Sequence, residues 1–462
     1  MIPLLRVFSR PLLIFVAATI AAMSAAPQPQ TSNTAQGGEP SDQQADASGW
    51  LQPVEDLNRS LPPWLQFGGD YRLRLEGQNG IKFGKADDSY LLGRLRLNLL
   101  VKPSRWFSLF GETQDSRIFF NQHLPSDLPY QNTWDIRQAY AEFGSSTEGW
   151  IDVIAGRQVL SFGGQRLIGP SNWSNTGRTF DAIRVDVHQP DFKISLFASS
   201  VVVDRDGVID HHVQGNNLHG IYSTFSHLIP RATIEPFVFW RLAPPGESLT
   251  QDPVPGALNE VTTGFRWTGE IPADFDYDVE MARQSGSVGS KSIAAWAAHW
   301  ELGKTFRKSW AMPRLLAAVN YASGTRDPSG RTWSTFDQLY PSSHDKLGFA
   351  DQVGWRNVEQ FRLGVEEKAG TKWKLKQTYE NFWLATTGDA LYGNSGKVVI
   401  PASTTAISRH IGQEIDAIAE YQPHRAVTFG FGCAHLFAGQ FLKQTSGGKD
   451  YNYPFAYGAY RF

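Results

Sequence analysis

Alternation of apolar and polar residues is the feature that most constrains the fold of this chain. It recurs in the segments 70–76, 93–101, 183–187 and 361–366, where Leu, Ile, Val, Tyr or Phe fill one parity and mostly Arg, Asp, Asn, Glu or Gly the other. Successive side chains of a β-strand point to opposite faces, so each segment predicts a strand with one apolar and one polar face. Aromatic residues at 13% and 43 glycines favour strands joined by turns, and the sequence therefore predicts an all-β fold.

Two all-β architectures fit this alternation, a soluble sandwich and a membrane barrel. The sandwich buries its apolar faces around a dry core, whereas the barrel turns them to lipid and lines a wet lumen with its polar faces. The segments run to about ten to thirteen residues, near the length that crosses a bilayer at a tilt and about twice the usual strand. Segment length therefore favours the membrane barrel.

The connections between the segments alternate between short and long. The short ones are 102–105, 145–149, 189–191, 269–273, 368–370 and 422–424. The long ones are 118–133, 159–178, 204–214, 243–259, 324–354, 385–409 and 438–449. Short periplasmic turns and long outer loops are typical of outer-membrane barrels, so the pattern predicts a transmembrane antiparallel β-barrel of about 18 strands. Such a barrel is wide enough for an aqueous channel, and an even strand number places both termini in the periplasm.

The N-terminal residues resemble an export signal. Arg6 and Arg10 precede an apolar run at 11–22, which is too short to span a bilayer, and small residues follow it. We expect a cleaved signal peptide and then a short disordered tether rich in Gln, Ser and Pro, with a short helix at 51–57. The expected organisation is a signal peptide at 1–26, a periplasmic linker at 27–60 and the barrel at 61–462.

The C-terminal residues carry an aromatic pattern. Tyr460 and Phe462 share one face of the last alternating segment. This ending resembles the signal through which bacterial barrels engage their assembly machinery, so we expect that machinery to recognise Phe462. No later run of eighteen apolar residues occurs, which disfavours a membrane-spanning helix after the signal.

Composition and motifs argue against other classes of function. The 43 Lys and Arg balance 45 Asp and Glu, so no net basic charge attracts nucleic acid, and a single Cys excludes an intrachain disulfide. The spacing of His211, His212, His219 and His227 fits no strong metal-ligand pattern. No nucleophile elbow, zinc-protease motif or phosphate loop occurs. We therefore expect no metal, no cofactor and no enzyme activity, and a barrel hydrolase or lyase that uses acids from different strands is the alternative from another class.

Charged side chains on the polar faces are the candidate pore lining. By parity, the residues expected to face the lumen include Arg72, Arg74, Arg94, Arg96, Arg184, Asp186, Arg362, Glu366 and Arg461. The planar guanidinium of Arg binds a carboxylate through two hydrogen bonds and stays charged, so rings of Arg favour anions. The alternative is that these arginines pair with neighbouring acids and only stabilise the wall.

Two long loops are candidate gates or substrate contacts. The candidate residues are Arg166, Trp173 and Arg178 in 159–178, and Asp337, Tyr340, His344 and Asp345 in 324–354. Long ordered loops commonly carry function, and either loop could fold into the pore. The alternative for 324–354 is a surface loop that shields the rim.

Several motifs resemble the alginate export family of outer-membrane porins. They are Gly156-Arg157-Gln158, the segments 162–166, 173–181 and 336–341, His344-Asp345-Lys346, the segment 348–357, and the C-terminal segments 430–439 and 457–462. The resemblance covers roughly residues 67–462. It implies an eighteen-stranded monomeric barrel that exports an anionic polysaccharide through an arginine-lined constriction, and it adds Arg137 and Arg157 to the expected pore lining.

The sequence therefore predicts a passive channel in the outer membrane of a Gram-negative bacterium. It passes an anionic, uronate-type polysaccharide or oligosaccharide, with outer-membrane lipid around the barrel and the substrate gradient or periplasmic export partners setting the direction. The alternative within the same class is an uptake porin for small anionic solutes.

Overall fold

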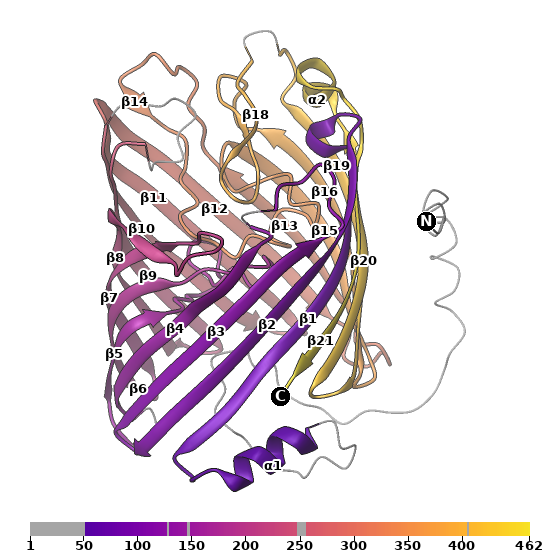
Figure 1. Ribbon diagram of the computed structural model, residues 1–462. Helices are drawn as coiled ribbons and strands as arrows, with labels where there is room; N and C mark the ends of the chain where they lie inside the picture. Colours follow the sequence, from indigo (N-terminus) through magenta and orange to yellow (C-terminus); the bar gives the residue numbers. More distant parts are fainter. Residues whose placement is uncertain (1–50, 127–128, 146–147, 247–255, 404–405) are drawn as a thin grey trace.

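The wall of the molecule is one antiparallel sheet closed into a barrel (Figure 1). The computed structural model describes residues 51–126, 129–145, 148–246, 256–403 and 406–462, and in these ranges eighteen strands form the wall. They are β1 (Leu65–Asn79), β2 (Asp87–Ser104), β3 (Phe107–Phe119), β4 (Asn132–Gly144), β5 (Ile151–Gln158), β6 (Phe180–Gln189), β7 (Phe192–Val203), β8 (His211–Ile229), β9 (Ala232–Ala243), β10 (Leu258–Ile271), β11 (Phe275–Val288), β12 (Lys291–Thr305), β13 (Arg314–Ala322), β15 (Val358–Ala369), β16 (Trp373–Leu384), β19 (His410–His424), β20 (Val427–Ala438) and β21 (Tyr451–Arg461). The predicted barrel and its strand number are confirmed.

The barrel closes where the last strand meets the first. β21 pairs antiparallel with β1, with Tyr460 opposite Tyr71. Beyond the end of β21, the N–H of Phe462 donates to the carbonyl of Gly69 at 3.0 Å, and the N–H of Gly69 donates back at 2.8 Å. Closure gives the backbone groups of both edge strands a partner, which hydrocarbon requires because it contains no water.

Burial along the strands is inverted relative to a soluble protein. On β1, Leu73 and Leu75 are 39% and 49% exposed, whereas Arg72 and Arg74 are 8% and 3% exposed. The apolar faces therefore point outward and the charged faces point into the lumen. A sandwich would bury the leucines, so this pattern excludes the soluble alternative.

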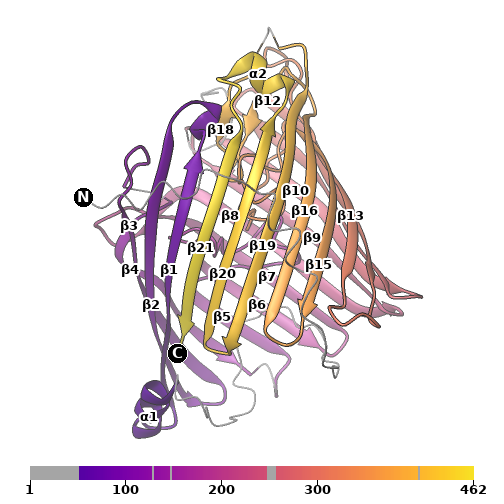
Figure 2. The same cartoon turned by 90° about the vertical axis from the view of Figure 1, so that its right-hand side faces the viewer.

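The two ends of the barrel differ in their connections. Helix α1 (Gln52–Ser60) lies at the same end as the C-terminus of β21 (Figures 1 and 2). It overlaps the helix expected at 51–57, starting one residue later and ending three residues later. The side chain of Asn58 docks α1 on β1 by bonding both backbone groups of Phe67, at 2.8 and 2.9 Å. Short turns, such as the β8–β9 turn after Ile229, occupy this end, and the long loops start from the other. None of the described helices has the length and apolarity of a membrane span.

The remaining short elements lie in the connections. They are η2 (Ile81–Phe83), β14 (Thr332–Trp333), β17 (Leu391–Tyr392), β18 (Val398–Ile400) and α2 (Gln440–Thr445). β14 pairs in parallel with the start of β12, and β17 pairs with β18 as a separate two-stranded sheet. The expected signal peptide at 1–26 and most of the expected linker lie outside the described residues.

Replacing Val319 with Arg tests which medium contacts the outer face. Val319 is 45% exposed on β13, and an Arg at the bilayer midplane costs about 2–4 kcal/mol. We expect Val319→Arg to lower the free energy of unfolding from lipid vesicles by about that amount, measured by urea titration of tryptophan fluorescence. Ser292→Arg, exposed near the loop end of β12, is the matched control with an expected loss of about 0–1 kcal/mol. Equal losses at both positions would contradict lipid contact at Val319.

Candidate functional site in the lumen

Three long connections fold back into the barrel. We name them loop A (159–179, between β5 and β6), loop B (323–357, between β13 and β15) and loop C (385–409, between β16 and β19, described except for 404–405). Loops A and B join through a parallel bridge between Ile168 and Tyr340. Loops B and C join where the N–H of Gly354 donates to the carbonyl of Tyr392 at 2.8 Å. The three loops therefore form one connected body inside the wall.

Loop A lies against a cluster of arginines on β1 and β2. Arg72 donates to the carbonyls of Asn172 and Trp173, at 2.9 and 3.1 Å. Arg94 donates to the same Asn172 carbonyl at 3.0 Å, and Arg74 donates to the Trp173 carbonyl at 2.5 Å. Arg72 and Arg94 face each other across the two strands, so their register aims both guanidinium groups at one turn of the loop.

The next residues of loop A follow β2 and β3. Arg96 donates to the side-chain oxygen of Gln114 at 2.6 Å, and Gln114 donates in turn to the carbonyl of Thr176 at 2.7 Å. Gly177 has a positive φ of 83°, and a Cβ there would lie 3.2 Å from Nη2 of Arg96 and 3.4 Å from Nε of Arg137. A glycine at this position lets the chain pass close to both arginines.

The cluster holds more positive than negative charge. Two of its arginines have a carboxylate partner: Arg74 pairs with Glu76, and Arg94 with Asp70 at 3.1 Å. Beside the cluster, Arg137 of β4 pairs with Glu112 at 2.6 Å. Arg72 and Arg96 form no ion pair with any described residue, although both are more than nine-tenths buried. Two buried guanidinium groups whose hydrogen bonds go only to carbonyl and amide oxygens make this the part of the lumen best suited to an anion.

Loop B is anchored on the opposite part of the wall through Asp337. Its carboxylate pairs with Arg241 of β9 and lies 3.6 Å from Nη1 of Arg356. Gln284 of β11 bonds both backbone groups of Asp337, at 2.6 and 2.7 Å. Burial raises the pKa of Asp337, but Arg241 and Arg356 outweigh burial and hold this pKa below its usual value. Asp337 is therefore a charged anchor in a dry site.

Further candidates tie the loops to each other and to the wall. Arg178 of loop A donates to the carbonyl of Pro341 in loop B at 2.8 Å. The hydroxyl of Tyr340 donates to Asn216 of β8 at 3.1 Å. Arg166 lies fully inside, 2.9 Å from Nε2 of His299 on β12, and burial lowers the pKa of this arginine.

Trp173 is held between the wall and loop B. The guanidinium of Arg74 lies 4.1 Å from the centre of one face of its ring, and the ring of His344 stacks on it with centroids 4.1 Å apart. His344 in turn contacts Asp351 through Nδ1 at 2.8 Å. This stack joins β1, loop A and loop B through side chains that the sequence singled out separately.

A second charged group lies where loop B meets β13, β15 and β16, and it contains Asp345, Arg362 and Glu366. Lys376 contacts the carboxylate of Asp345 at 3.1 Å, and Arg362 donates to the Asp345 carbonyl at 2.9 Å. Burial raises the pKa of Asp345, but Lys346, Lys376 and Arg362 together hold it well below its usual value. Arg362 also pairs with Glu380 at 3.3 Å, and Glu366 pairs with Arg314 at 3.3 Å. Positive and negative charges alternate here, unlike in the cluster on β1 and β2.

The other expected pore-lining residues have separate positions. Arg184 and Asp186 pair with each other on β6 at 3.3 Å, and Arg461 lies opposite Asp70 at the end nearer the C-terminus. Arg157 is different, because it pairs with Asp181 at 2.8 Å on the face that also carries Ile183, which is 59% exposed. The family resemblance placed Arg157 among the pore-lining residues. This expectation is wrong, because the side chain of Arg157 lies on the outer face of the wall. Its charge is satisfied there by Asp181 near the loop end of the strands.

Several residues that build the lumen were not among the sequence candidates. They are Glu112, Gln114, Arg241, Gln284 and Arg356, together with the carbonyl groups of Asn172 and Trp173. Parity within β3, β9 and β11 could have found the side chains on those strands. The carbonyl groups leave no sequence signal, because every residue has one.

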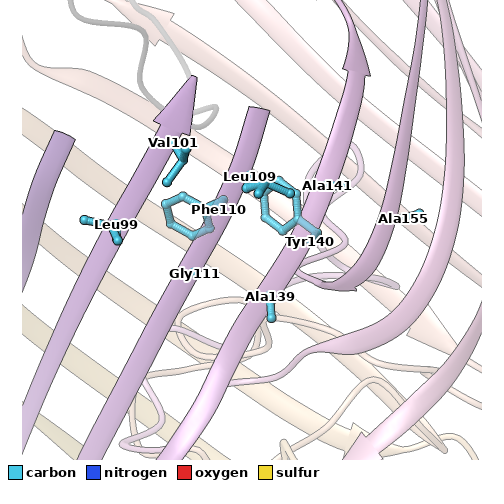
Figure 3. Close-up of a pocket in the computed structure, with 9 residues that line it drawn as sticks. All are labelled: Leu99, Val101, Leu109, Phe110, Gly111, Ala139, Tyr140, Ala141 and Ala155. Carbon is cyan, nitrogen blue, oxygen red and sulfur yellow. The ribbon is translucent and has the colours of Figure 1, made fainter. Parts of the chain in front are cut away.

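A shallow hollow also occurs on the outer face, away from the loops (Figure 3). It has a volume of about 420 Å³ and lies over β2, β3, β4 and β5, where Leu99, Val101 and Leu109 surround the small residues Gly111 and Ala139. Leu99 and Leu109 are each 42% exposed, so the hollow faces the surrounding medium and not the lumen. In the parts of the chain that the structure describes, no three His, Cys, Asp or Glu side chains are placed to hold a metal ion.

A closed barrel with an apolar exterior, a charged interior and inward-folded loops defines an outer-membrane channel of the porin type. Similar solved structures are the outer membrane protein opdK from Pseudomonas aeruginosa (TM-score 0.56, 10% identity), the same organism's OpdK with vanillate (0.54, 10%) and its OccK2 (OpdF) in complex with glucuronate (0.54, 9%). Each match covers 86% of this chain and 98% of the other, and at these identities the likeness concerns the fold alone.

The family follows from the sequence match. The family model described as alginate export matches residues 63–456, and the chain therefore belongs to the alginate export family. No curated protein matches the sequence. Family and fold together indicate a channel and not an enzyme.

Asp337→Ala tests the anchor of loop B. The substitution leaves Arg241 and Arg356 buried without this carboxylate, and breaking one side of a buried pair costs about 3–5 kcal/mol. We expect faster hydrogen exchange of loop B amides and a higher single-channel conductance. Asp327→Ala, at an exposed site of the same loop that bonds Ser329, is the control and leaves both unchanged. Unaltered exchange in Asp337→Ala would contradict the anchoring role.

Asp210, in the β7–β8 connection, predicts a pH dependence at the rim. Its carboxylate accepts the N–H of Arg205 at 2.6 Å and the amide of Asn132 at 2.7 Å, and burial together with Asp204 raises its pKa to about 7. Because the pKa of Asp210 is higher in the ordered segment than in the disordered one, protonation of Asp210 stabilises the ordered segment. Protection of residues 204–210 against hydrogen exchange, corrected for intrinsic rates, should therefore fall progressively from about pH 4 and reach its lower limit above about pH 7. Asp210→Asn should abolish this fall, and an identical pH profile in the variant would contradict the assignment.

Proposed function

We propose that the protein is an anion-selective channel for uronate-type saccharides, with the arginines of β1 and β2 as its filter. The observation that carries this proposal is the pair Arg72 and Arg96, which are buried in the lumen without an ion-pair partner among the described residues. A carboxylate would supply the missing charge and could bind a guanidinium through two hydrogen bonds. The family description, alginate export, names a polymer of sugar carboxylates and supports the same ligand chemistry.

Loop A is the gate in this proposal. Its Asn172 and Trp173 carbonyls occupy the donors of Arg72, Arg74 and Arg94 that a substrate carboxylate would use. A carboxylate is a stronger acceptor for these donors than a neutral carbonyl, because both partners are then charged. An arriving anion therefore competes with the loop for the arginines and releases it.

The inward-folded loops bear on the size of the substrate that could pass. A threaded polysaccharide requires loops A, B and C to leave together, since they bond to one another. A single sugar acid or short oligosaccharide requires only the turn at Asn172 and Trp173 to move. This observation favours oligosaccharides over long polymer, and it favours uptake of small anionic solutes as the second candidate function. The structures of OccK2 in complex with glucuronate and OpdK with vanillate, both carboxylates, support that second candidate.

The proposal also fixes an orientation. Short turns, α1 and the C-terminus face the periplasm, and the loop end faces outward, as in other outer-membrane barrels. Phe462 then lies in the β1–β21 seam at the periplasmic end, where assembly machinery has access to it. Periplasmic export partners would also approach this end, and Arg461 would line its mouth.

Reversal potentials across a planar bilayer test the filter. In a KCl gradient the purified protein should prefer anions, and the double variant Arg72→Gln with Arg96→Gln should lose at least half of that preference. Gln suits the test because neither arginine has a carboxylate that would be left unpaired. The control is Arg117→Gln, since Arg117 lies on the outer face and pairs with Asp115 at 2.9 Å.

The length of the substrate is tested with the same bilayers. Glucuronate and oligo-uronates of increasing length should block the current transiently, with block weakened in the double variant. Passage of long polymer would favour the polysaccharide function, and block by the single sugar acid alone would favour small-solute uptake. Cation preference in the unaltered protein, or equal selectivity in the double variant, would contradict the arginine filter.

A further inference from the structure

The outer face of β10, β11 and β12 changes character abruptly near the loop end. Thr263, Arg283 and Trp296 form one row across the three strands. On the turn side of this row the outward residues are apolar, including Phe265, Trp267 and Trp300, all at least 37% exposed. On the loop side the outward face also carries exposed polar residues, namely Asn259, Ser285, Ser287 and Ser292, beside the apolar Val261 and Ala294. The row therefore marks the change from a wholly apolar outer face to one that also carries polar residues, as expected at the edge of the apolar belt.

The height of the belt agrees with this boundary. Lys304, whose ammonium group lies 4.7 Å from the Phe275 ring centre, marks the turn side of β12. Lys304 and Trp296 are separated by about 26 Å of strand at about 3.3 Å per residue, or roughly 20 Å across a membrane at the usual tilt. This is close to the apolar band of about 25 Å that outer-membrane barrels present to lipid. Arg283 thus lies where hydrocarbon gives way to headgroups.

Arg283 differs from the other outward-facing arginines of the strands. Arg117 pairs with Asp115, two positions away on the same strand, and Arg157 pairs with Asp181. Arg283 is exposed and forms no hydrogen bond or ion pair with any residue in the described ranges. The residue in the place of Asp115, two positions nearer the turn end, is Met281, and the neighbour two positions nearer the loop end is Ser285, so neither side brings a charge. The wall therefore presents one uncompensated guanidinium to the headgroup layer.

The surroundings of Arg283 fit a phosphorylated sugar. Guanidinium binds phosphate through two hydrogen bonds, and the exposed hydroxyls of Thr263 and Ser285 flank it. Trp296 stacks on Tyr321 with centroids 4.3 Å apart, which gives the boundary an aromatic anchor. Exposed polar residues continue from Ser285 through Ser287 towards the loops. A lipid contacts them only if its headgroup extends beyond its phosphate, towards the loop end of the barrel. A sugar headgroup does so, whereas a phospholipid headgroup ends near the boundary.

We propose that Arg283, with Thr263 and Ser285, binds the phosphate of a phosphorylated glycolipid in the outer leaflet. The assignment to the outer leaflet depends on the orientation given under the proposed function. The assignment of a phosphate ligand depends only on the residues of the outer face. The glycolipid phosphate supplies the anion that Asp115 supplies to Arg117 elsewhere on the wall.

Native mass spectrometry of the full barrel in detergent tests the binding. The probes are bisphosphorylated lipid A, its dephosphorylated form and phosphatidylglycerol. We expect the phosphorylated glycolipid to bind at least fivefold more tightly than either of the others, and Arg283→Gln to remove this difference. Arg117→Gln should leave it unchanged. Equal binding of the three lipids, or binding insensitive to Arg283→Gln, overturns the proposal, and equal binding of phosphatidylglycerol and lipid A assigns the site to phospholipid instead.

Two charge-pairing variants make the test independent of folding. Ser285→Asp places an acid two positions from Arg283, on its loop side, and should weaken lipid A binding as much as Arg283→Gln does. Asp115→Ser removes the acid beside Arg117 and should create an additional lipid A site. Failure of both effects would contradict charge pairing as the determinant.

The leaflet is tested separately from the pore. Ser287→Cys should react with an impermeant maleimide on intact cells, in a background where Cys433 is replaced by Ser. Reaction only after the periplasm is opened would overturn the outer-leaflet assignment. Anion selectivity in Arg283→Gln should equal that of the unaltered protein, so loss of the lipid site and loss of the arginine filter are distinguished.

Discussion

The backbone of a membrane wall must satisfy all of its hydrogen bonds within the protein, because hydrocarbon supplies neither donors nor acceptors. This constraint explains why β21 pairs with β1 and why Phe462 extends the pairing by one more residue, to Gly69. It also explains the inverted burial, since a closed sheet in lipid places apolar side chains outside. The charged residues of each strand are then concentrated in the lumen.

Concentrating charge in a narrow space creates the candidate site. Where acids and bases alternate, as around Arg314 and Glu366, the charges neutralise each other and stabilise the wall. The β1–β2 cluster lacks this balance, and loop A supplies carbonyl groups to it. Neutral carbonyl groups hold loop A on arginines of which two have no ion-pair partner among the described residues. An anion is a stronger acceptor for these arginines and is therefore suited to displace the loop. In the proposed gating, loop B, anchored through Asp337, is the fixed partner against which loop A would move.

Alternation predicted the barrel and the inward faces of β1 and β2, because a lipid-facing strand has a strict period of two. It was ambiguous for Arg137, which sits where the β3–β4 register slips between Glu112 and Thr113. Arg157 shows another limit, since beyond the apolar belt the outer face also carries charged residues. The contacts of loop A with the arginines could not be predicted, because they use carbonyl groups and depend on how three loops pack together. The stack of Trp173 on His344 depends on the same packing.

Accessibility of spin labels along one strand tests the central claim most directly. Labels at Leu315, Ala317 and Val319 of β13, placed one at a time in lipid vesicles with Cys433 replaced by Ser, should collide with dissolved oxygen and not with a water-soluble nickel complex. Labels at Leu316 and Ala318, on the inner face, should lack this lipid signature. Access of the nickel complex to the three outward positions would show that water and not hydrocarbon surrounds the apolar face, and would contradict the account.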